Sequence, residues 1–303
     1  MARRLHLARQ LARSHAALAA AAVLALMTLG ALFAPLVAPQ RTDEPGALHL
    51  ADAFKPPMSP PYDRGQGAPG VYLMGTDDQG RDVLSAILFG LRVSLFVGFS
   101  VVILSSILGT LLGIVSGYAG GRVDSVIMGI ADVFLSFPSI LVALFILSVW
   151  REGGMERLVL SIVSVRWVVY ARTARGSTLA EREKDYISAA RALGQRPVRI
   201  MFGHILPNVM SPLAIIAAVE IGMVIMLEAT LSFLGVGTPI TQPSLGMLIK
   251  NGSEDLLSGS WWISLFPGLA LVMLVFSINI LVDWLRDVLN PHIAAAESAA
   301  VQA

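Results

Sequence analysis

Long apolar runs alternate with short polar segments along this chain of 303 residues. Six runs approach the ~20 residues that a helix needs to cross ~30 Å of hydrocarbon. They are residues 16–37, 92–116, 127–150, 158–171, 212–234 and 262–285. The fourth run is short and carries Arg166. We therefore expect an all-α polytopic membrane protein of about six transmembrane helices.

A polar segment rich in basic residues, 184–207, interrupts this pattern. Gly194 can take the positive φ that ends one helix, and Pro197 suits the first turn of a second, where its missing N–H is no loss. We expect two short helices here, closed by Pro207. The Ala189–Ala190 pair would leave one side of the first helix flat, so that a partner's backbone can approach closely. The alternative is a solvated amphipathic linker.

Composition supports membrane insertion independently. The chain is 55% hydrophobic and 14% charged with a mean hydropathy of +0.71, which leaves too little polar surface for a soluble globule of this length. Basic residues resist translocation. The basic N-terminus, and 172–199 with seven basic and three acidic residues, are expected in the cytoplasm. Residues 39–82, with four basic and seven acidic, are expected outside. Six crossings place the C-terminus inside.

The first 38 residues have a second interpretation, because a basic start followed by an apolar run also occurs in secretory signals. The run is long for a signal, and its removal would leave five crossings. We expect a first transmembrane helix instead.

The sequence lacks the residues that several classes of functional site require. No cysteine occurs, the five histidines show no ligand spacing, and the net charge of +1 gives no indication of nucleic-acid binding. No Gly-x4-Gly-Lys-Ser/Thr loop is present to hold ATP phosphates. We expect no metal, no cofactor and no catalytic residues, so energy for any active process must come from a partner.

Ionisable residues inside apolar runs are costly and tend to face a bundle interior or a cavity. Four candidates for the pathway or for intramembrane charge pairs are Asp132, Arg166, Glu220 and Glu228. At ~1.5 Å rise per residue, Arg166, Glu220 and Asp132 should lie at similar depth, so we expect Arg166 to pair with Glu220 or Asp132. The alternative is structural pairing between helices.

Two other features concern packing. Gly98, Gly109 and Gly113 lie in the second run and Gly117 directly follows it. Three of the four are at four-residue spacing, and small residues at that spacing let helices approach closely. Residues 39–72 should form an irregular loop, and 235–261 should contain a hairpin or a short helix at the membrane surface.

The polar segment resembles the cytoplasmic coupling loop of bacterial ABC-importer permeases. Their pattern is Glu-Ala-Ala, three residues, Gly, nine residues, Ile, one residue, Leu-Pro. Gly194, Leu206 and Pro207 fall at that spacing, while Ser188 replaces the Glu and His204 replaces the Ile. The peptide-permease branch also has an acidic-aromatic pair before the alanines, here Asp185-Tyr186, and a closing His-Ile-Leu-Pro-Asn.

Four further blocks match the same branch: MGTDDQGRDVLS (74–85), LEATLSFLGVG (227–237), LFPG (265–268) and DWLRDVLNP (283–291). The resemblance spans about residues 71–291 and identifies the chain as similar to permeases of the dipeptide, oligopeptide and nickel family, in particular their C subunit. It implies a homologous second permease, two cytoplasmic ATPase subunits, an extracytoplasmic solute-binding protein, surrounding lipid and a bacterial inner-membrane location.

The same resemblance assigns roles to residues. The residues implied in ATPase coupling are Asp185, Tyr186, Ser188, Ala189, Ala190, Arg191, Gly194, Pro197, His204, Leu206 and Pro207. The residues implied in contact with the binding protein are Asp77, Asp78, Arg81 and Asp82. An equal alternative is that these four residues cap a short helix. The implied organisation is a cytoplasmic N-terminus (1–15), a first helix (16–38), an external loop (39–90), a permease core (91–290) with its coupling loop (172–211), and a cytoplasmic tail (291–303).

Function remains open in two respects. The same machine could carry peptides, or it could carry nickel chelates, glutathione or other small solutes. A proton-coupled secondary transporter using Asp132, Glu220 and Glu228 as a relay is a more distant alternative, and it leaves the polar segment 184–207 unexplained.

Overall fold

The computed structural model describes residues 14–41, 50–62, 70–150, 154–238 and 244–289. Within these ranges the chain is helical, and its only extended pairings are isolated bridges that join Ser59 to Tyr72 and Thr76 to Asp82. The all-α prediction is confirmed. The basic N-terminus and the tail 291–303 lie outside the described residues.

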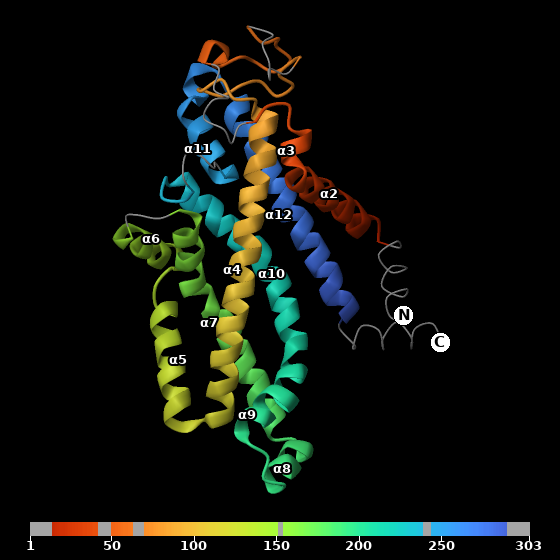
Figure 1. Cartoon of the computed structure of the whole chain (residues 1–303), viewed down its shortest axis with the longest axis vertical. Coiled ribbons are helices and arrows are strands. Elements are labelled where there is room, and N and C mark those ends of the chain that lie inside the picture. Colours follow the sequence, from red (N-terminus) through yellow and green to blue (C-terminus); the bar gives the residue numbers. More distant parts are fainter. Residues whose placement is uncertain (1–13, 42–49, 63–69, 151–153, 239–243, 290–303) are drawn as a thin grey trace. The chain divides into compact units, whose positions relative to one another are not determined.

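The chain divides into two compact units, one of residues 1–96 and 228–303, the other of 97–227. Helices of the first unit, shown in red and blue in Figure 1, are α2 (His15–Leu32), α3 (Ala34–Val37), α11 (Leu245–Glu254) and α12 (Trp262–Leu289), with the short turns η2 (Leu50–Asp52) and η4 (Leu256–Ser258). Helices of the second are α5 (Gly121–Leu135), α6 (Ser139–Val149), α7 (Met155–Arg182), α8 (Asp185–Ala192) and α9 (Pro197–Ile200). Both α4 (Val83–Ala119) and α10 (Leu206–Phe233) contribute to each unit.

Four helices of the described chain are long and apolar enough to cross a membrane: His15–Leu32, Val83–Ala119, Pro197–Phe233 and Trp262–Val288. The third predicted run is a broken pair instead, because α5 and α6 meet at 92°. Pro138 stands at this break, where it disfavours helical backbone in the residue before it. If the bent pair is counted as one span, the described chain has five candidate membrane spans. The predicted sixth span would have to be α7, and this helix contains five arginines.

The helix α7 runs to Arg182, so the first part of the predicted coupling loop 172–211 is helical. One predicted boundary in the polar segment is wrong. Pro207 does not close the segment, since the chain stays helical from Pro197 to Phe233. The π-helical turn η3 (Met201–Ile205) precedes Pro207 and contains Gly203, whose carbonyl a proline ring would meet in a regular α-helix. The wider turn lets the helix continue.

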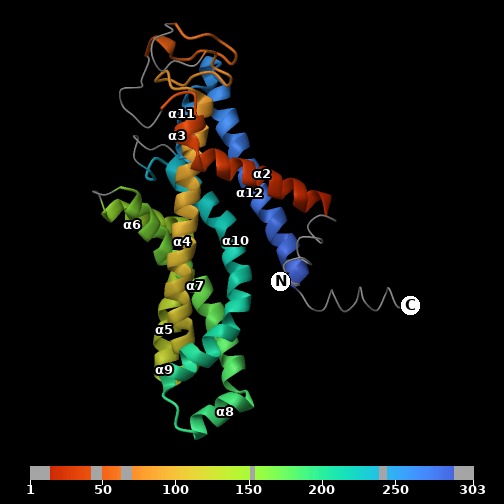
Figure 2. The same cartoon turned by 45° about the vertical axis from the view of Figure 1, so that its right-hand side comes forward.

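In the second unit, α4 and α7 touch along the predicted glycine face. A Cβ at Gly109 would lie 2.3 Å from the Trp167 carbonyl oxygen, and one at Gly113 would lie 2.3 Å from that of Ala171. A Cβ at Gly117 would lie 2.8 Å from the Cβ of Thr178 and 2.9 Å from the Arg175 carbonyl oxygen. Figures 1 and 2 both show α5 and α7 beside this half of α4, with α8 at the end of the unit remote from α6. The glycine prediction is confirmed as packing within the chain.

In the first unit, the predicted surface helix of 235–261 is α11, which packs on α12 and the end of α10. Gly246 would place a Cβ 2.2 Å from the Ala229 carbonyl oxygen, so the two backbones touch. Of the tandem tryptophans, Trp261 is half exposed, whereas Trp262 is buried and its indole N–H donates to the Thr76 carbonyl (3.0 Å).

Candidate functional site

The turn between α8 and α9 has the geometry that the sequence predicts. Gly194 has φ +72°, its N–H donates to the Arg191 carbonyl (2.9 Å), and the Gln195 N–H donates to the Ala190 carbonyl (3.1 Å). These two bonds form a Schellman motif, which requires a left-handed residue at the position of Gly194. Pro197 occupies the first turn of α9. The turn therefore sets the direction between two short helices.

One side of α8 is packed inside the second unit. Ile187 and Ala190 are buried in a cluster with Ile200, Ile205 and other apolar residues of α4, α7 and α10. The expectation that the Ala189–Ala190 pair forms one flat surface for a partner is therefore wrong for Ala190, because only Ala189 is exposed. The outward surface consists instead of the exposed residues Ser188, Ala189, Arg191, Leu193, Val198, Arg199 and Phe202.

A polar network holds the base of α8. The Tyr186 hydroxyl donates to Glu181 Oε1 at the end of α7, and Asn208 Nδ2 on α10 donates to the same hydroxyl (3.1 Å). His204 Nε2 pairs with Gln195 Oε1 (3.0 Å). Loss of hydration and the hydrogen bond with Glu181 raise the pKa of Tyr186 to about 12. These residues join the helices on either side of the turn.

The arginines of α8 and α7 also tie this region to the end of α4. The Arg191 guanidinium lies 5.1 Å from the centre of the Tyr118 ring, which is cation–π geometry. Arg182 Nη1 donates to the Gly117 carbonyl (2.7 Å). Movement of α8 is therefore linked to both α4 and α7.

Deeper along α7, Arg166 and Glu220 form a bidentate ion pair between α7 and α10. Arg166 Nε donates to Glu220 Oε2 (2.7 Å) and Nη2 to Oε1 (2.6 Å). Their side chains are 18% and 7% exposed. Of the two partners expected for Arg166, the structure contains Glu220 and not Asp132.

Asp132 pairs with Arg172 of α7 instead, through Arg172 Nη2. One turn further toward α8, Arg175 Nε and Nη2 donate to the two carboxylate oxygens of Asp124 (2.5 and 2.7 Å). These two pairs fasten α5 to α7. Sequence reasoning missed Arg172, Arg175 and Asp124, although the eight-residue spacing of the two aspartates places both near one face of a helix.

Glu228 is fully buried in the first unit and is held by hydroxyl groups. It accepts hydrogen bonds from Ser94 of α4 (2.8 Å) and Ser232 of α10 (2.7 Å). Its neighbour Ala229 is the residue on which Gly246 of α11 rests. Glu228 therefore joins helices around α11, an arrangement that favours the structural interpretation of this charge.

The predicted binding-protein contact is largely buried in its own chain. Asp77 accepts from the Arg81 N–H (2.8 Å) and pairs with Arg81 Nε (2.7 Å), and Asp82 Oδ2 accepts from the backbone N–H of Ser85 (2.8 Å) at the start of α4. Burial raises the pKa of Asp77, and Arg81 opposes this only in part. The geometry supports the capping alternative for Asp82. Asp78 is the least buried of the four.

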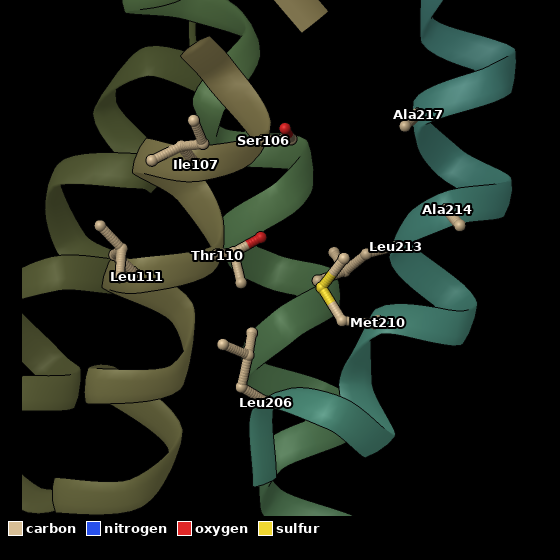
Figure 3. A pocket seen from close by; sticks show the side chains of 9 residues that line it. All are labelled: Ser106, Ile107, Thr110, Leu111, Leu206, Met210, Leu213, Ala214 and Ala217. Carbon is tan, nitrogen blue, oxygen red and sulfur yellow. The ribbon is translucent and has the colours of Figure 1, made fainter. Parts of the chain in front are cut away.

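An open cavity of about 300 Å³ lies between α4 and α10 within the second unit. Figure 3 shows its lining, which is apolar apart from the hydroxyls of Ser106 and Thr110. In that view Met210 and Leu206 extend from α10 toward α4. The cavity suits an apolar group and offers no ionisable side chain.

Comparison with known proteins assigns the chain to a family. Residues 109–295 match the family model of the binding-protein-dependent transport system inner membrane component, and residues 5–57 match the N-terminal transmembrane domain of oligopeptide transport permease C. The first match covers more than half of the chain. The protein belongs to this family of inner-membrane permeases.

Named relatives cover most of the permease. It is 35% identical over 270 residues to the dipeptide transport system permease protein DppC of Haemophilus influenzae, which covers 88% of each chain. It is 36% identical over 233 residues to the glutathione transport system permease protein GsiD of Pectobacterium atrosepticum, 77% of each chain. The resemblance derived from the motifs is confirmed.

A solved structure has the same fold. The MetNI methionine ABC transporter, in an inward-facing conformation, aligns with a TM-score of 0.55, covering 68% of the permease and 96% of that chain. At 18% identity this likeness establishes the fold and nothing further. By its family match, the permease is a multi-pass inner-membrane component of a binding-protein-dependent transport system.

Proposed function

We propose that the permease imports di- or oligopeptides delivered by a solute-binding protein, and that it forms half of the translocation pathway beside a homologous permease. The observation that carries this proposal is 34–36% identity, over most of the chain, to permeases named for dipeptide or peptide transport. The glutathione permease among the relatives favours one close alternative, since glutathione is itself a small peptide.

The outward surface of α8 and α9 is the proposed docking site for cytoplasmic ATPase subunits, which would supply all ATP hydrolysis. Support comes from the fixed Schellman turn and from the network that links α8 to α7 and α10. A closing ATPase pair would displace α8, and the bundle would respond by switching between inward-open and outward-open states.

Reconstitution tests the substrate. Proteoliposomes that contain the permease, its sister subunit and the ATPases should accumulate labelled dipeptide only with ATP and binding protein. Uptake that follows a proton gradient without ATP would support the secondary-transporter alternative. Accumulation of glutathione, but not of dipeptides, would identify glutathione as the substrate in place of di- or oligopeptides.

Gly194→Val is expected to reduce ATP-driven uptake several-fold while membrane insertion stays normal. A Cβ at Gly194 meets nothing within 4 Å, so the penalty arises from the backbone conformation alone, at roughly 1–2 kcal/mol for an L-residue with positive φ. Gly194→Asn is the control, because asparagine tolerates this conformation. ATPase co-purification and vesicle uptake measure the effect. Full coupling in the valine variant would exclude the assignment.

The orientation proposed here places the loop after α3 outside and α8–α9 inside. Because the sequence contains no cysteine, Tyr62→Cys and Arg196→Cys can be labelled without background, and both residues are exposed. A membrane-impermeant maleimide should modify Tyr62→Cys in intact spheroplasts and Arg196→Cys only after detergent treatment. The opposite pattern would reverse the topology.

A further inference from the structure

The helix α5 exposes two different surfaces. Val126, Ile130 and Val133 form an apolar stripe whose members are each at least half exposed. Ser125, Gly129, Asp132 and Ser136, also exposed, form a second stripe of polar and small residues, which we call the polar face of α5. At 3.6 residues per turn the stripes are separated by roughly 100° around the helix. Contact with hydrocarbon suits the apolar stripe, but on the polar face it would expose the charge of Asp132 to lipid, which is costly.

The polar face carries an ion pair whose partners are both accessible. The side chains of Asp132 and Arg172 are 61% and 51% exposed. By contrast, Arg166 and Glu220 are 18% and 7% exposed and bind each other through two hydrogen bonds. Asp132 and Arg172 are therefore accessible to another charged group, which could bind either of them in place of the other. Arg166 and Glu220 are shielded, and their pairing serves to hold α7 and α10 together.

Asp132 lies near the middle of the segment formed by α5 and α6, residues 121–149. The α5–α6 pair together has the composition of one broken span. The helix α5 begins next to Gly117, whose carbonyl binds Arg182 at the α8 end of the unit. Asp132 is eleven residues beyond Gly121, or roughly 16 Å along the axis, about half of a ~30 Å hydrocarbon layer.

A half-exposed charge pair at that depth needs water or polar groups around it, because a charge facing lipid costs at least ~2.5 kcal/mol on insertion scales. Space is available beside the pair. A Cβ on Gly129 of α5, or on Gly176 of α7, would meet nothing within 4 Å, and both glycines are exposed. The small side chains along the polar face leave this surface open.

We infer that the polar face of α5 lines a water-filled part of the translocation pathway, and that Asp132 and Arg172 bind the charged ends of a zwitterionic substrate there. This inference rests on the proposed function and specifies how peptide termini are recognised. The substrate ammonium replaces Arg172 at Asp132, and its carboxylate replaces Asp132 at Arg172, where a guanidinium can bind both oxygens. When no substrate is bound, the two residues neutralise each other.

Cysteine accessibility tests the aqueous surface. In inside-out vesicles containing the whole importer, a membrane-impermeant thiol reagent should react at least tenfold faster with Ser125→Cys, Gly129→Cys and Ser136→Cys than with the neighbouring Val126→Cys, Ile130→Cys and Val133→Cys. Equal rates on both stripes would overturn the inference. Reaction of the polar face only in the isolated permease would also overturn it, because the sister subunit would then cover this face.

Substrate protection tests the binding role. Dialanine at millimolar concentration should slow labelling of Ser136→Cys several-fold, whereas N-acetyl-dialanine amide, which lacks both charges, should not. Protection should be lost when Asp132→Asn or Arg172→Gln is added. Asp124→Asn is the matched control, because Asp124 pairs with Arg175 of the same two helices nearer α8, and this variant should keep the protection.

Labelling rates refer to inserted protein, normalised to the thiols that react after denaturation, so poor yield of a variant does not obscure the result. Absence of protection by dialanine, or equal protection by the blocked peptide, would overturn the inference even if the wild-type importer accumulates dipeptides. If the wild-type importer accumulates no peptide at all, the proposed function itself fails.

Discussion

Replacing Glu220 by leucine is expected to lower the free energy of unfolding of the permease by about 3–5 kcal/mol, because Arg166 is left as a buried charge without its partner. Arg166→Leu should lower the free energy of unfolding by a similar amount, since it leaves the Glu220 carboxylate buried without a positive partner. The double variant should be less harmful than either single one, because two leucines fill the site without leaving a charge. Denaturant unfolding in detergent and membrane yield both report this difference.

The Asp132–Arg172 pair is the control for that cycle. It joins the same helix α7 to α5, but both side chains are more than half exposed. Water can solvate either partner when the other is removed, so the coupling free energy should stay within about 1 kcal/mol. Strict additivity at Arg166 and Glu220 would mean that the two charges are solvated separately, contrary to their contact in the structure.

Gly113→Ala is expected to destabilise the permease by about 1–3 kcal/mol, although alanine normally stabilises a helix relative to glycine by up to about 1 kcal/mol. The added methyl group would lie 2.3 Å from the Ala171 carbonyl oxygen and 2.7 Å from the Cβ of Ala174, and both neighbours belong to the packed core of α7. The helices α4 and α7 would have to separate.

Gly129→Ala provides the matched comparison, since a Cβ there meets nothing within 4 Å. It should be neutral or stabilising by up to about 1 kcal/mol, the intrinsic preference of a helix for alanine. The two variants make the same chemical change in neighbouring helices, so opposite signs in thermal unfolding isolate the effect of the close contact. A stabilised Gly113→Ala variant would contradict the packing described here.

Local rules predicted the features that depend on single residues. Gly194 was predicted from the need for positive φ, the α4 glycine face from its spacing, and the partner of Arg166 from the penalty for an unpaired charge. Each of these features depends on a short stretch of chain, or on one large free-energy penalty such as that for an unpaired buried charge. Little knowledge of the tertiary arrangement is therefore needed to predict them.

Features that depend on relative helix position were not predictable in this way. The partner of Asp132 is Arg172 because α7 continues to Arg182 and packs beside α5, and the sequence does not show that continuation. Ala190 faces inward because Ile187 and Ile200 lie against the same core. Asp77 and Arg81 satisfy each other internally, which charge patterning alone cannot distinguish from an exposed cluster.

The contact of α4 with α7 at Gly109, Gly113 and Gly117 has a mechanical consequence. Long side chains between two helices can change rotamer and so absorb a small displacement, but touching backbones leave almost nothing to deform. Over this contact we expect the two helices to move together as one rigid unit. A displacement at Arg182 and Gly117 should therefore reach Trp167, about two helical turns away and next to Arg166.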